Sequence, residues 1–349
     1  MIEIELKFQI PETKRQALLK AIDPKKSQIL PLKARYFDTP DRQLGNQGIA
    51  LRQRLEGDRW VQTLKAAGKS HLHRFEHNHD LGVLEQAPEL DLNIYAQNSE
   101  TWHILDAALN TQKDQLQLQF ETDIQRTLRI IHFEDSEIEV CLDVGEIRTT
   151  VAQKPVHEVE FELKAGTVEG LLKFCFEWVK KYQIWLDVRS KAEFGNLLVM
   201  QKTVSPARLG KSVALNKKDS ADANLRQLIA QHLQHLLPNI AAIAAQVAEA
   251  EHIQQAHEAL NCLYLSLSLF GHWSSAVSDK WAHQLAAFKQ QFEHLQHLQH
   301  MQRTLGALLQ NPKTAESLEQ DLLYAIEKLQ NLVKSPQNVQ HYLELLIFS

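Results

Sequence analysis

The sequence predicts an α+β chain, with an antiparallel β domain over residues 1–200 followed by an all-α helical bundle over residues 221–349. Short segments in which ionic and apolar residues alternate predict the strands, because successive side chains of a strand point to opposite faces. Turn-rich pieces such as 38–41 and 45–48 separate these segments. Beyond Thr203 the alternation disappears and Leu, Ala, Gln and His dominate, which indicates helices.

The bulk properties limit the classes of protein to which the chain can belong. Its 349 residues suffice for two domains with separate cores, and its formal net charge of −5 gives no general attraction to nucleic acid or membranes. Cys141, Cys175 and Cys262 lie far apart without a CxxC spacing, which argues against a disulfide framework or a structural zinc site. The N-terminus lacks the pattern of a signal peptide, and no apolar run approaches the roughly 20 residues of a membrane span. We therefore expect a cytoplasmic protein.

Two segments carry the strongest pattern, Met1–Phe8 and His157–Lys164. In each, ionic residues occupy one side of the predicted strand and apolar residues the other: Glu3, Glu5 and Lys7 in the first, and Glu158, Glu160, Glu162 and Lys164 in the second. Paired carboxylates are typical ligands of hard divalent cations. Two such acidic ladders in one domain indicate a site for metal ions.

Further strands repeat the one-sided ionic pattern. They are Ala50–Glu56, Trp60–Ala66, Leu72–Glu76, Phe120–Phe133 and Ile138–Asp143, and their ionic residues include Arg52, Arg54, Lys65, Arg74, Glu76, Arg126, Glu139 and Asp143. For any single strand, the simplest interpretation is a sheet with one solvated face. Charges of both signs recur on most strands, however, and many antiparallel strands can curl until the sheet closes. Helices covering the apolar outside would then turn the ionic face inward.

An interior rich in Arg, Lys and Glu cannot be a core, because unpaired buried charge is too costly. It predicts a hydrated channel that binds an ionic ligand. Arginine and lysine match phosphate oxygens, and carboxylates hold Mg²⁺ or Mn²⁺. The chain has no Walker A or GxGxxG motif, so side chains must hold the phosphates. Together these features indicate a polyanion bound as a metal complex.

Helical patterns interrupt the β domain and fill the second domain. In the first domain they cover Glu12–Ile22, Ser99–Leu109 and Val168–Lys181. Residues 201–220 form the predicted linker, and the expected helices beyond it cover about 224–248, 251–271, 276–310 and 314–334. Pro238 is expected to kink or break the first of these.

The first 200 residues resemble the CYTH superfamily, the triphosphate tunnel metalloenzymes. The resemblance begins with an ExExK signature at residues 3–7 and continues, in order and spacing, through these residues: Tyr36-Phe37-Asp38-Thr39, Leu51-Arg52-Gln53-Arg54, Thr63-Leu64-Lys65, Arg74 with Glu76, Arg126, Leu142-Asp143-Val144-Gly145, Glu158-Val159-Glu160-Phe161-Glu162-Leu163-Lys164 and Ser190-Lys191.

The resemblance implies an eight-stranded antiparallel tunnel, or barrel, that holds triphosphate inside. Carried over residue by residue, the metal ligands would be Glu3, Glu5, Asp143, Glu158 and Glu160. The side chains that bind the phosphates and support catalysis would be Lys7, Arg52, Arg54, Lys65, Arg126 and Lys191. Glu76 would orient basic residues in the tunnel, and Arg35 and Arg74 are candidates for additional phosphate contacts. The implied cofactors are two divalent ions, Mg²⁺ or Mn²⁺.

The implied reaction is metal-assisted hydrolysis of a phosphoanhydride bond. A tunnel domain followed by a helical domain resembles the bacterial CYTH–CHAD proteins, which include inorganic triphosphatases, so inorganic triphosphate is the expected substrate. Three alternatives stay open: a thiamine triphosphatase, an adenylate cyclase on the same tunnel, and a non-catalytic polyphosphate-binding module.

The helical domain departs from the CHAD pattern. Its candidate signature helix, Glu251–Phe270, keeps the apolar frame but has Gln254 at the usual histidine position and lacks the usual arginines. We expect a short, degenerate CHAD-like bundle that packs on the tunnel domain, with a dimer contact as one role. His294, His297 and His300 are interpreted as a solvated or interface-facing stripe in preference to a metal site, because their spacing drifts around a helix.

Overall fold

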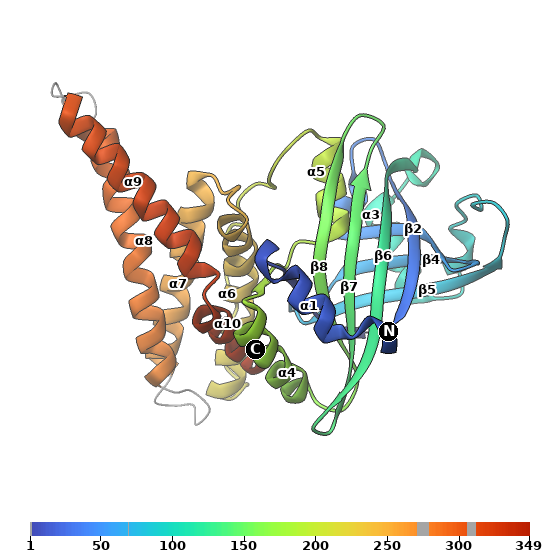
Figure 1. Cartoon of the computed structure of the whole chain (residues 1–349), viewed down its shortest axis with the longest axis horizontal. Coiled ribbons are helices and arrows are strands. Elements are labelled where there is room, and N and C mark those ends of the chain that lie inside the picture. Colours follow the sequence, from blue (N-terminus) through green and yellow to red (C-terminus); the bar gives the residue numbers. More distant parts are fainter. Residues whose placement is uncertain (1, 69, 271–278, 306–311) are drawn as a thin grey trace. The chain divides into compact units, whose positions relative to one another are not determined.

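The structure is a computed structural model that describes residues 2–68, 70–270, 279–305 and 312–349 (Figure 1). The chain divides into two compact units. The first comprises Met1–Ile184 and Val188–Ser205, and the second Trp185–Asp187 and Pro206–Ser349. The first unit holds the β-barrel and the second holds the helices that follow it, so the predicted α+β class is confirmed.

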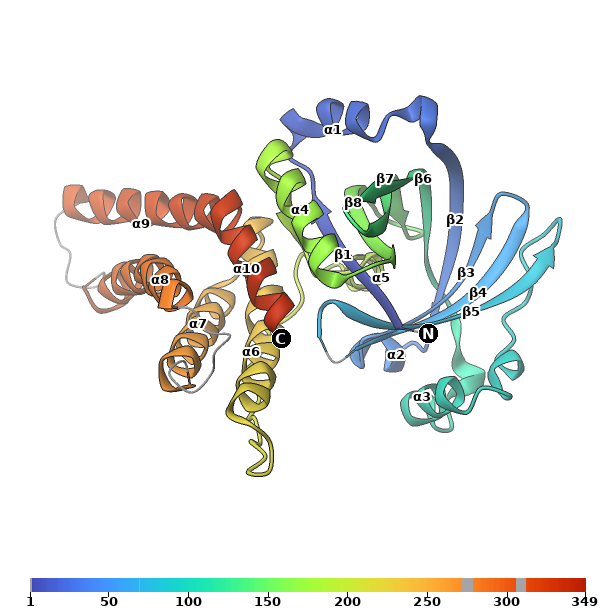
Figure 2. The same ribbon diagram turned by 90° about the horizontal axis from the view of Figure 1, so that it is seen from below.

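Eight antiparallel strands close into a barrel in the first unit (Figures 1 and 2). They are β1 (Ile2–Gln9), β2 (Gln28–Asp38), β3 (Ile49–Glu56), β4 (Arg59–Ala67), β5 (His73–Val83), β6 (Gln117–Phe133), β7 (Ser136–Arg148) and β8 (Gln153–Ala165). Their order is β5-β4-β3-β2-β6-β7-β8-β1, and pairing of β1 with β5 closes the ring. A two-residue strand, β9 (Trp185–Leu186), is part of the second unit.

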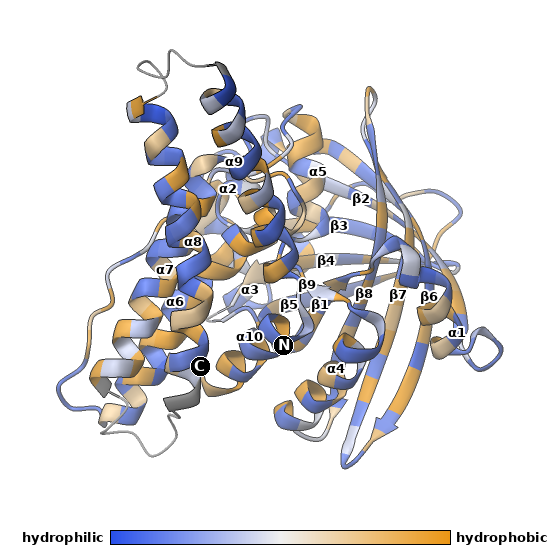
Figure 3. Ribbon diagram, turned by 60° about the vertical axis from the view of Figure 1, so that its left-hand side comes forward, coloured by the Kyte–Doolittle hydropathy of each residue, from blue (hydrophilic) through white to orange (hydrophobic). Residues whose placement is uncertain are grey.

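Helices cover the outer, apolar faces of the strands. α4 (Val168–Tyr182) packs on β8, where the rings of Phe161 and Phe174 lie 5.5 Å apart. α3 (Ser99–Leu109) packs on β3 and β4, and α1 (Arg15–Ile22) is held to β6 by Arg129, which donates to the Ile22 carbonyl at 3.2 Å. Hydrophobic and hydrophilic residues alternate along these strands (Figure 3). The ionic residues therefore face inward, as the sequence predicts.

One end of the barrel interior is apolar and is filled by α5 (Lys191–Val199), a helix that the sequence analysis did not predict. Its Phe194 and Leu197 join a buried cluster with Tyr36, Phe120, Ile124, Ile147 and Val156. The Ser190 side chain caps the helix by accepting from the Glu193 N–H at 3.1 Å. The short helix α2 (Gln43–Asn46) lies before β3, and the buried Asp38 carboxylate accepts from the backbone N–H groups of Leu44 and Gly45.

Gly195 allows α5 to approach β6 closely. A Cβ at this position would lie 2.1 Å from a ring carbon of Phe120. We expect Gly195→Ala to lower the free energy of unfolding of the first unit by about 1–3 kcal/mol, the usual cost of overpacking a core. Denaturant unfolding measures the loss, and in a double-mutant cycle with Phe120→Leu the two losses should be clearly less than additive. Wild-type stability of Gly195→Ala would contradict this packing.

The second unit contains α6 (Ala221–Ala244), α7 (Ala250–Phe270), α8 (Asp279–Leu305), α9 (Pro312–Val333) and α10 (Pro336–Phe348). The first four correspond to the predicted helices, although parts of the ranges 251–271 and 276–310 fall on 271–278 and 306–311, outside the described residues. α10 was not predicted. α6 continues through Pro238, so a break there does not occur. Leu236, Leu237 and Ile240 are buried around the proline, and their burial outweighs the lost hydrogen bond.

The histidines of α8 face solvent within the chain. His294, His297 and His300 are all exposed, and none of them belongs to the cluster of possible metal ligands found among the described residues. This placement agrees with a solvated stripe. Within the described part of the chain, none of the helices combines the length and hydropathy needed to cross a lipid bilayer.

Candidate active site

The barrel encloses an ionic cavity of about 240 Å³, lined by all eight of its strands and by the start of α5. Among the described residues, its charged lining consists of Glu3, Glu5, Lys7, Arg52, Arg54, Lys65, Arg74, Glu76, Arg126, Glu139, Asp143, Glu160, Glu162, Lys164 and Lys191. Eight of these are cationic and seven are acidic, so the cavity is close to neutral when all are ionised. The structure thus brings the predicted site residues together, with Glu158 buried beside the cavity instead of lining it.

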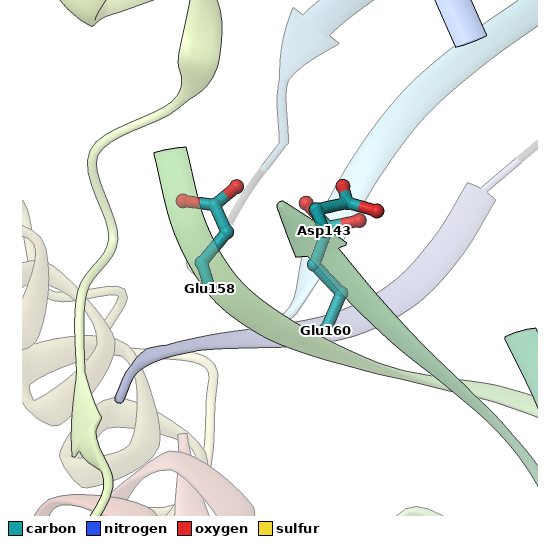
Figure 4. Close-up of side chains that lie close together, drawn as sticks. All are labelled: Asp143, Glu158 and Glu160. Atoms are coloured by element: carbon teal, nitrogen blue, oxygen red, sulfur yellow. The ribbon is translucent and has the colours of Figure 1, made fainter. Parts of the chain in front are cut away.

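Three carboxylates on neighbouring strands converge at one point of this site (Figure 4). Asp143 on β7 lies directly opposite Glu158 on β8, and Glu160 follows two residues along the same face of β8. One oxygen from each of the three lies within 4.8 Å of the others. We call Asp143, Glu158 and Glu160 the acidic trio.

Two cations, Arg126 and Lys191, bind the acidic trio directly and offset most of its negative charge. Arg126 donates from Nε and Nη2 to the two oxygens of Asp143, both at 2.7 Å, and from Nη2 to Glu160 at 2.6 Å. The Lys191 ammonium contacts all three carboxylates. Burial alone would raise the pKa of Glu160, but the charges of Lys191 and Arg126 outweigh it and hold that pKa well below its usual range. Lys7 approaches the trio from β1, with its Nζ 3.7 Å from Glu158.

A second group of charges links β1, β4 and β5. Lys65 Nζ lies 3.0 Å from a Glu3 oxygen and also pairs with Glu76. Burial, together with a hydrogen bond to Glu76, raises the pKa of Glu3 to about 8. Burial would raise the pKa of Glu76, but the hydrogen bond from Glu3 and the charge of Lys65 outweigh burial and lower this pKa. Glu3 and Glu76 therefore share one proton near neutral pH.

Glu5 lies beside this shared-proton pair and is ionised. Arg74 donates to Glu5 at 3.0 Å. Burial disfavours the charge, yet Lys65 and Arg74 lower the pKa of Glu5 below its usual value. Arg74 thus lines the cavity as the sequence suggests. Arg35 does not line it, because it points to the other face of β2 and lies over the Phe37 ring at 5.5 Å.

Beside the arginines of β3 lies the hydroxyl of Tyr36 on β2, a group to which the sequence analysis assigned no role. Arg52 Nη1 donates to the Tyr36 hydroxyl at 3.4 Å, and Arg54 Nε donates to Glu56 at 2.6 Å. Burial would raise the pKa of the Tyr36 hydroxyl, but the charges of Arg52 and Lys191 outweigh burial and lower this pKa. Tyr36 faces the cavity because it pairs with Arg52 across β2 and β3. That strand pairing is the signal that identifies it, and a single sequence does not supply it.

Glu139, Cys141, Glu162 and Lys164 also line the cavity without having been assigned to the site. Glu162 and Lys164 pair at 2.9 Å and line the cavity where it meets solvent, since 40% of the Lys164 side chain is exposed. Glu139 and Glu5 both lie opposite Glu162 on the strands that flank β8. The acidic face therefore extends further along the barrel than the predicted ligand set.

The donor chemistry fits a hard divalent cation. The site offers carboxylate oxygens from β1, β7 and β8, the ligands that Mg²⁺ and Mn²⁺ prefer. The cluster of possible metal ligands found among the described residues consists of carboxylates, the donors that oxygen-preferring ions such as Mg²⁺ favour.

Comparisons with known proteins place this arrangement in a family. The model of the CYTH domain matches residues 1–192. An inorganic triphosphatase of Haemophilus influenzae is 36% identical over 166 residues, which are 47% of this chain and 44% of that protein. The match thus spans less than half of the length of the curated relative.

Two solved structures are similar to part of this chain. A Hippeastrum protein, described as an adenylyl cyclase candidate with a dominant triphosphatase activity, matches 58% of this chain and 98% of its own, at 17% identity and a TM-score of 0.38. An adenylate cyclase candidate from Bacillus halodurans matches 52% of this chain and 89% of its own, at 20% identity and a TM-score of 0.37. Because the CYTH domain model covers more than half of the sequence, this chain belongs to the CYTH domain family.

Proposed function

We propose that this protein is a divalent-metal-dependent inorganic triphosphatase, which hydrolyses tripolyphosphate to diphosphate and phosphate inside the barrel. The observation that carries the proposal is the cavity itself, in which cations and carboxylates face one another across about 240 Å³. Guanidinium and ammonium groups match phosphate oxygens, and the carboxylates match the metal that accompanies a triphosphate. The Haemophilus relative, which is described as an inorganic triphosphatase, supports the same substrate.

The shape and lining of the cavity favour a small inorganic ligand. Its volume is below the roughly 300–1,000 Å³ of pockets for drug-sized molecules. Among the described lining residues, Tyr36 is the aromatic one, and its ring is already stacked on Phe120 at 4.5 Å. The described lining therefore offers a nucleobase or thiazole ring only one aromatic side chain, and one face of that ring is already packed against Phe120.

The residues present divide into two roles in this proposal. Lys7, Arg52, Arg54, Lys65, Arg74, Arg126 and Lys191 bind and orient the phosphates, and Glu76 holds Lys65 in place. Glu3, Glu5, Asp143, Glu158 and Glu160 would hold two ions, Mg²⁺ or Mn²⁺. When bound, such ions neutralise phosphate charge and lower the pKa of water. Most of the catalytic effect then comes from positioning and electrostatic stabilisation, as in phosphoryl transfer generally.

Metal affinity should depend on pH through Glu3. Its pKa of about 8 reflects burial, the facing Glu76 and Glu5, and incomplete compensation by Lys65. A divalent ion must displace this proton, so we expect affinity to rise with pH up to about 8 and then to level. Calorimetric titration with Mn²⁺ between about pH 6 and pH 8.5 measures this. Glu76→Gln should move the rise to lower pH, and a pH-independent affinity of the wild type would contradict the assignment of Glu3.

A substrate panel tests the proposed function. We expect fast release of phosphate from tripolyphosphate with Mg²⁺ or Mn²⁺, and slow or no turnover of ATP and thiamine triphosphate. Preferred turnover of either organic triphosphate would overturn the inorganic substrate. Binding of tripolyphosphate without turnover of any of the three would show a binding module instead of an enzyme.

A further inference from the structure

The ammonium group of Lys191 lies among the three carboxylates of the acidic trio. Its Nζ lies 2.7 Å from Asp143 Oδ2, 2.5 Å from Glu158 Oε1 and 2.9 Å from Glu160 Oε1. Asp143 and Glu158 are almost fully buried, with exposures of 1% each. Together with Arg126, Lys191 thus supplies the positive charge that offsets the repulsion among these three close carboxylates.

Arg126 and Lys191 bind the same trio in different ways. The planar guanidinium of Arg126 binds Asp143 through two parallel hydrogen bonds and extends from β6, which is paired on both sides. Lys191 is the first residue of α5, at the cavity wall beside Ser190 and Ala192. Its ammonium is a point charge on a flexible four-carbon stem, without a fixed fork geometry. Of the two cations, Lys191 is therefore the one that can leave the trio while the barrel stays intact.

The dimensions of the trio suit a divalent ion in place of the ammonium. The oxygens of its three carboxylates lie within 4.8 Å of one another. Carboxylate oxygens this close together could supply part of the oxygen coordination of one divalent ion. An ion of charge +2 and an ammonium cannot share this space, because they repel each other. Entry of the metal requires Lys191 to move.

We propose that Lys191 is an exchangeable counter-ion, which holds the acidic trio until a divalent cation displaces it and then turns to the phosphates in the cavity. The inference rests on the proposed function of the site, since it assigns Lys191 a role in both metal and triphosphate binding. Before metal enters, Lys191 is committed to the carboxylates. After metal enters, its charge is available to the substrate. Metal and triphosphate binding are thereby coupled, and linkage makes the coupling reciprocal.

Lys191→Met separates this role from that of an ordinary phosphate ligand. Without any phosphate present, the variant should bind Mn²⁺ about 10–100-fold more tightly than the wild type, because no ammonium competes. With EDTA, it should bind a methylene-bridged, non-hydrolysable analogue of tripolyphosphate as weakly as the wild type does. With saturating Mn²⁺, it should bind the analogue about 10–100-fold more weakly than the wild type. Calorimetry measures all three affinities.

Lys33→Met is the matched control. Lys33 is exposed on β2, outside the cavity lining, so its loss removes the same charge from the same unit without touching the trio. It should leave all three affinities unchanged. An equal loss of analogue affinity in Lys191→Met with and without Mn²⁺ would overturn the proposal, and so would an unchanged or weaker affinity for Mn²⁺.

Asp143→Asn keeps the test decisive should Lys191→Met fail to fold. It retains Lys191 and removes one carboxylate charge, so it should weaken Mn²⁺ binding at least about tenfold. Unchanged Mn²⁺ affinity in this variant would show that the metal binds elsewhere and would overturn the exchange. The Mn²⁺ titrations need no turnover, so they can fail while the wild type still cleaves tripolyphosphate. Conversely, the proposed function fails if the wild type neither binds the analogue nor cleaves tripolyphosphate.

Discussion

Replacing Glu160 by Gln is expected to lower kcat on tripolyphosphate by a factor on the order of 10²–10³, the usual effect of losing one preorganised electrostatic contact. Glu160 is the member of the acidic trio that lines the cavity with the greatest exposure, 19% of its side chain. Its oxygens contact Arg126 at 2.6 Å and Lys191 at 2.9 Å. The amide keeps the size of the side chain but removes a charged ligand from the proposed metal site.

The measurement is steady-state phosphate release from tripolyphosphate at saturating Mg²⁺ or Mn²⁺. Glu146→Gln provides the matched control, since Glu146 lies on the outer face of β7, where it pairs with Arg148. That variant should keep wild-type kinetics. Wild-type turnover in Glu160→Gln would remove Glu160 from the catalytic site.

Replacing Arg126 by Met should have the largest effect on stability and should also abolish most activity. The guanidinium neutralises Asp143, which is 1% exposed, and Glu160. Breaking a buried ion pair from one side costs about 3–5 kcal/mol, because the remaining charge is left without its partner. The same guanidinium is assigned to the phosphates, so residual folded protein should turn over slowly.

Arg148→Met is the control for Arg126→Met. It tests whether the loss of stability depends on the burial of the arginine or only on the number of carboxylates near it. Arg148 lies near three carboxylates on β6 and β7, but 42% of its side chain is exposed. Exposed ion pairs contribute about 0–1 kcal/mol, so we expect a loss within that range. Denaturant unfolding of the first unit measures both variants. Equal losses in the two variants would contradict the view that the charges inside the barrel are effectively buried.

Much of the barrel could be predicted from the sequence because strand alternation is a local signal. Every second residue of a strand lies on the same face. This rule alone places Glu3, Glu5 and Lys7 on one face of their strand, and it does the same for Glu158 and Glu160. Closure needed an additional argument from the charges, and the pairing of β1 with β5 confirms it. The position of a residue along the barrel depends on strand register, which alternation does not define. For this reason Glu162 and Lys164 were not placed in the cavity, which they line.

The helix α5 was not predicted for a different physical reason. α5 covers nine residues, includes Gly195, and is stabilised by tertiary packing of Phe194 and Leu197 inside the barrel. Its propensity and periodicity are therefore weak in isolation. The exchange proposed for Lys191 depends on this helix, because its first residue reaches the acidic trio only when α5 fills the end of the barrel. The motif Ser190-Lys191 identified the lysine, but its three carboxylate partners required the structure.

Chelator-sensitive release of phosphate from tripolyphosphate is the most direct test of the central claim, that the ionic barrel is a metal-dependent catalytic site. The wild-type protein is assayed with Mg²⁺ or Mn²⁺ and again after addition of EDTA. The account predicts rapid release with metal, one phosphate and one diphosphate per tripolyphosphate, and no release with EDTA. Release that continues at the same rate in EDTA, or an intact substrate under both conditions, would contradict it.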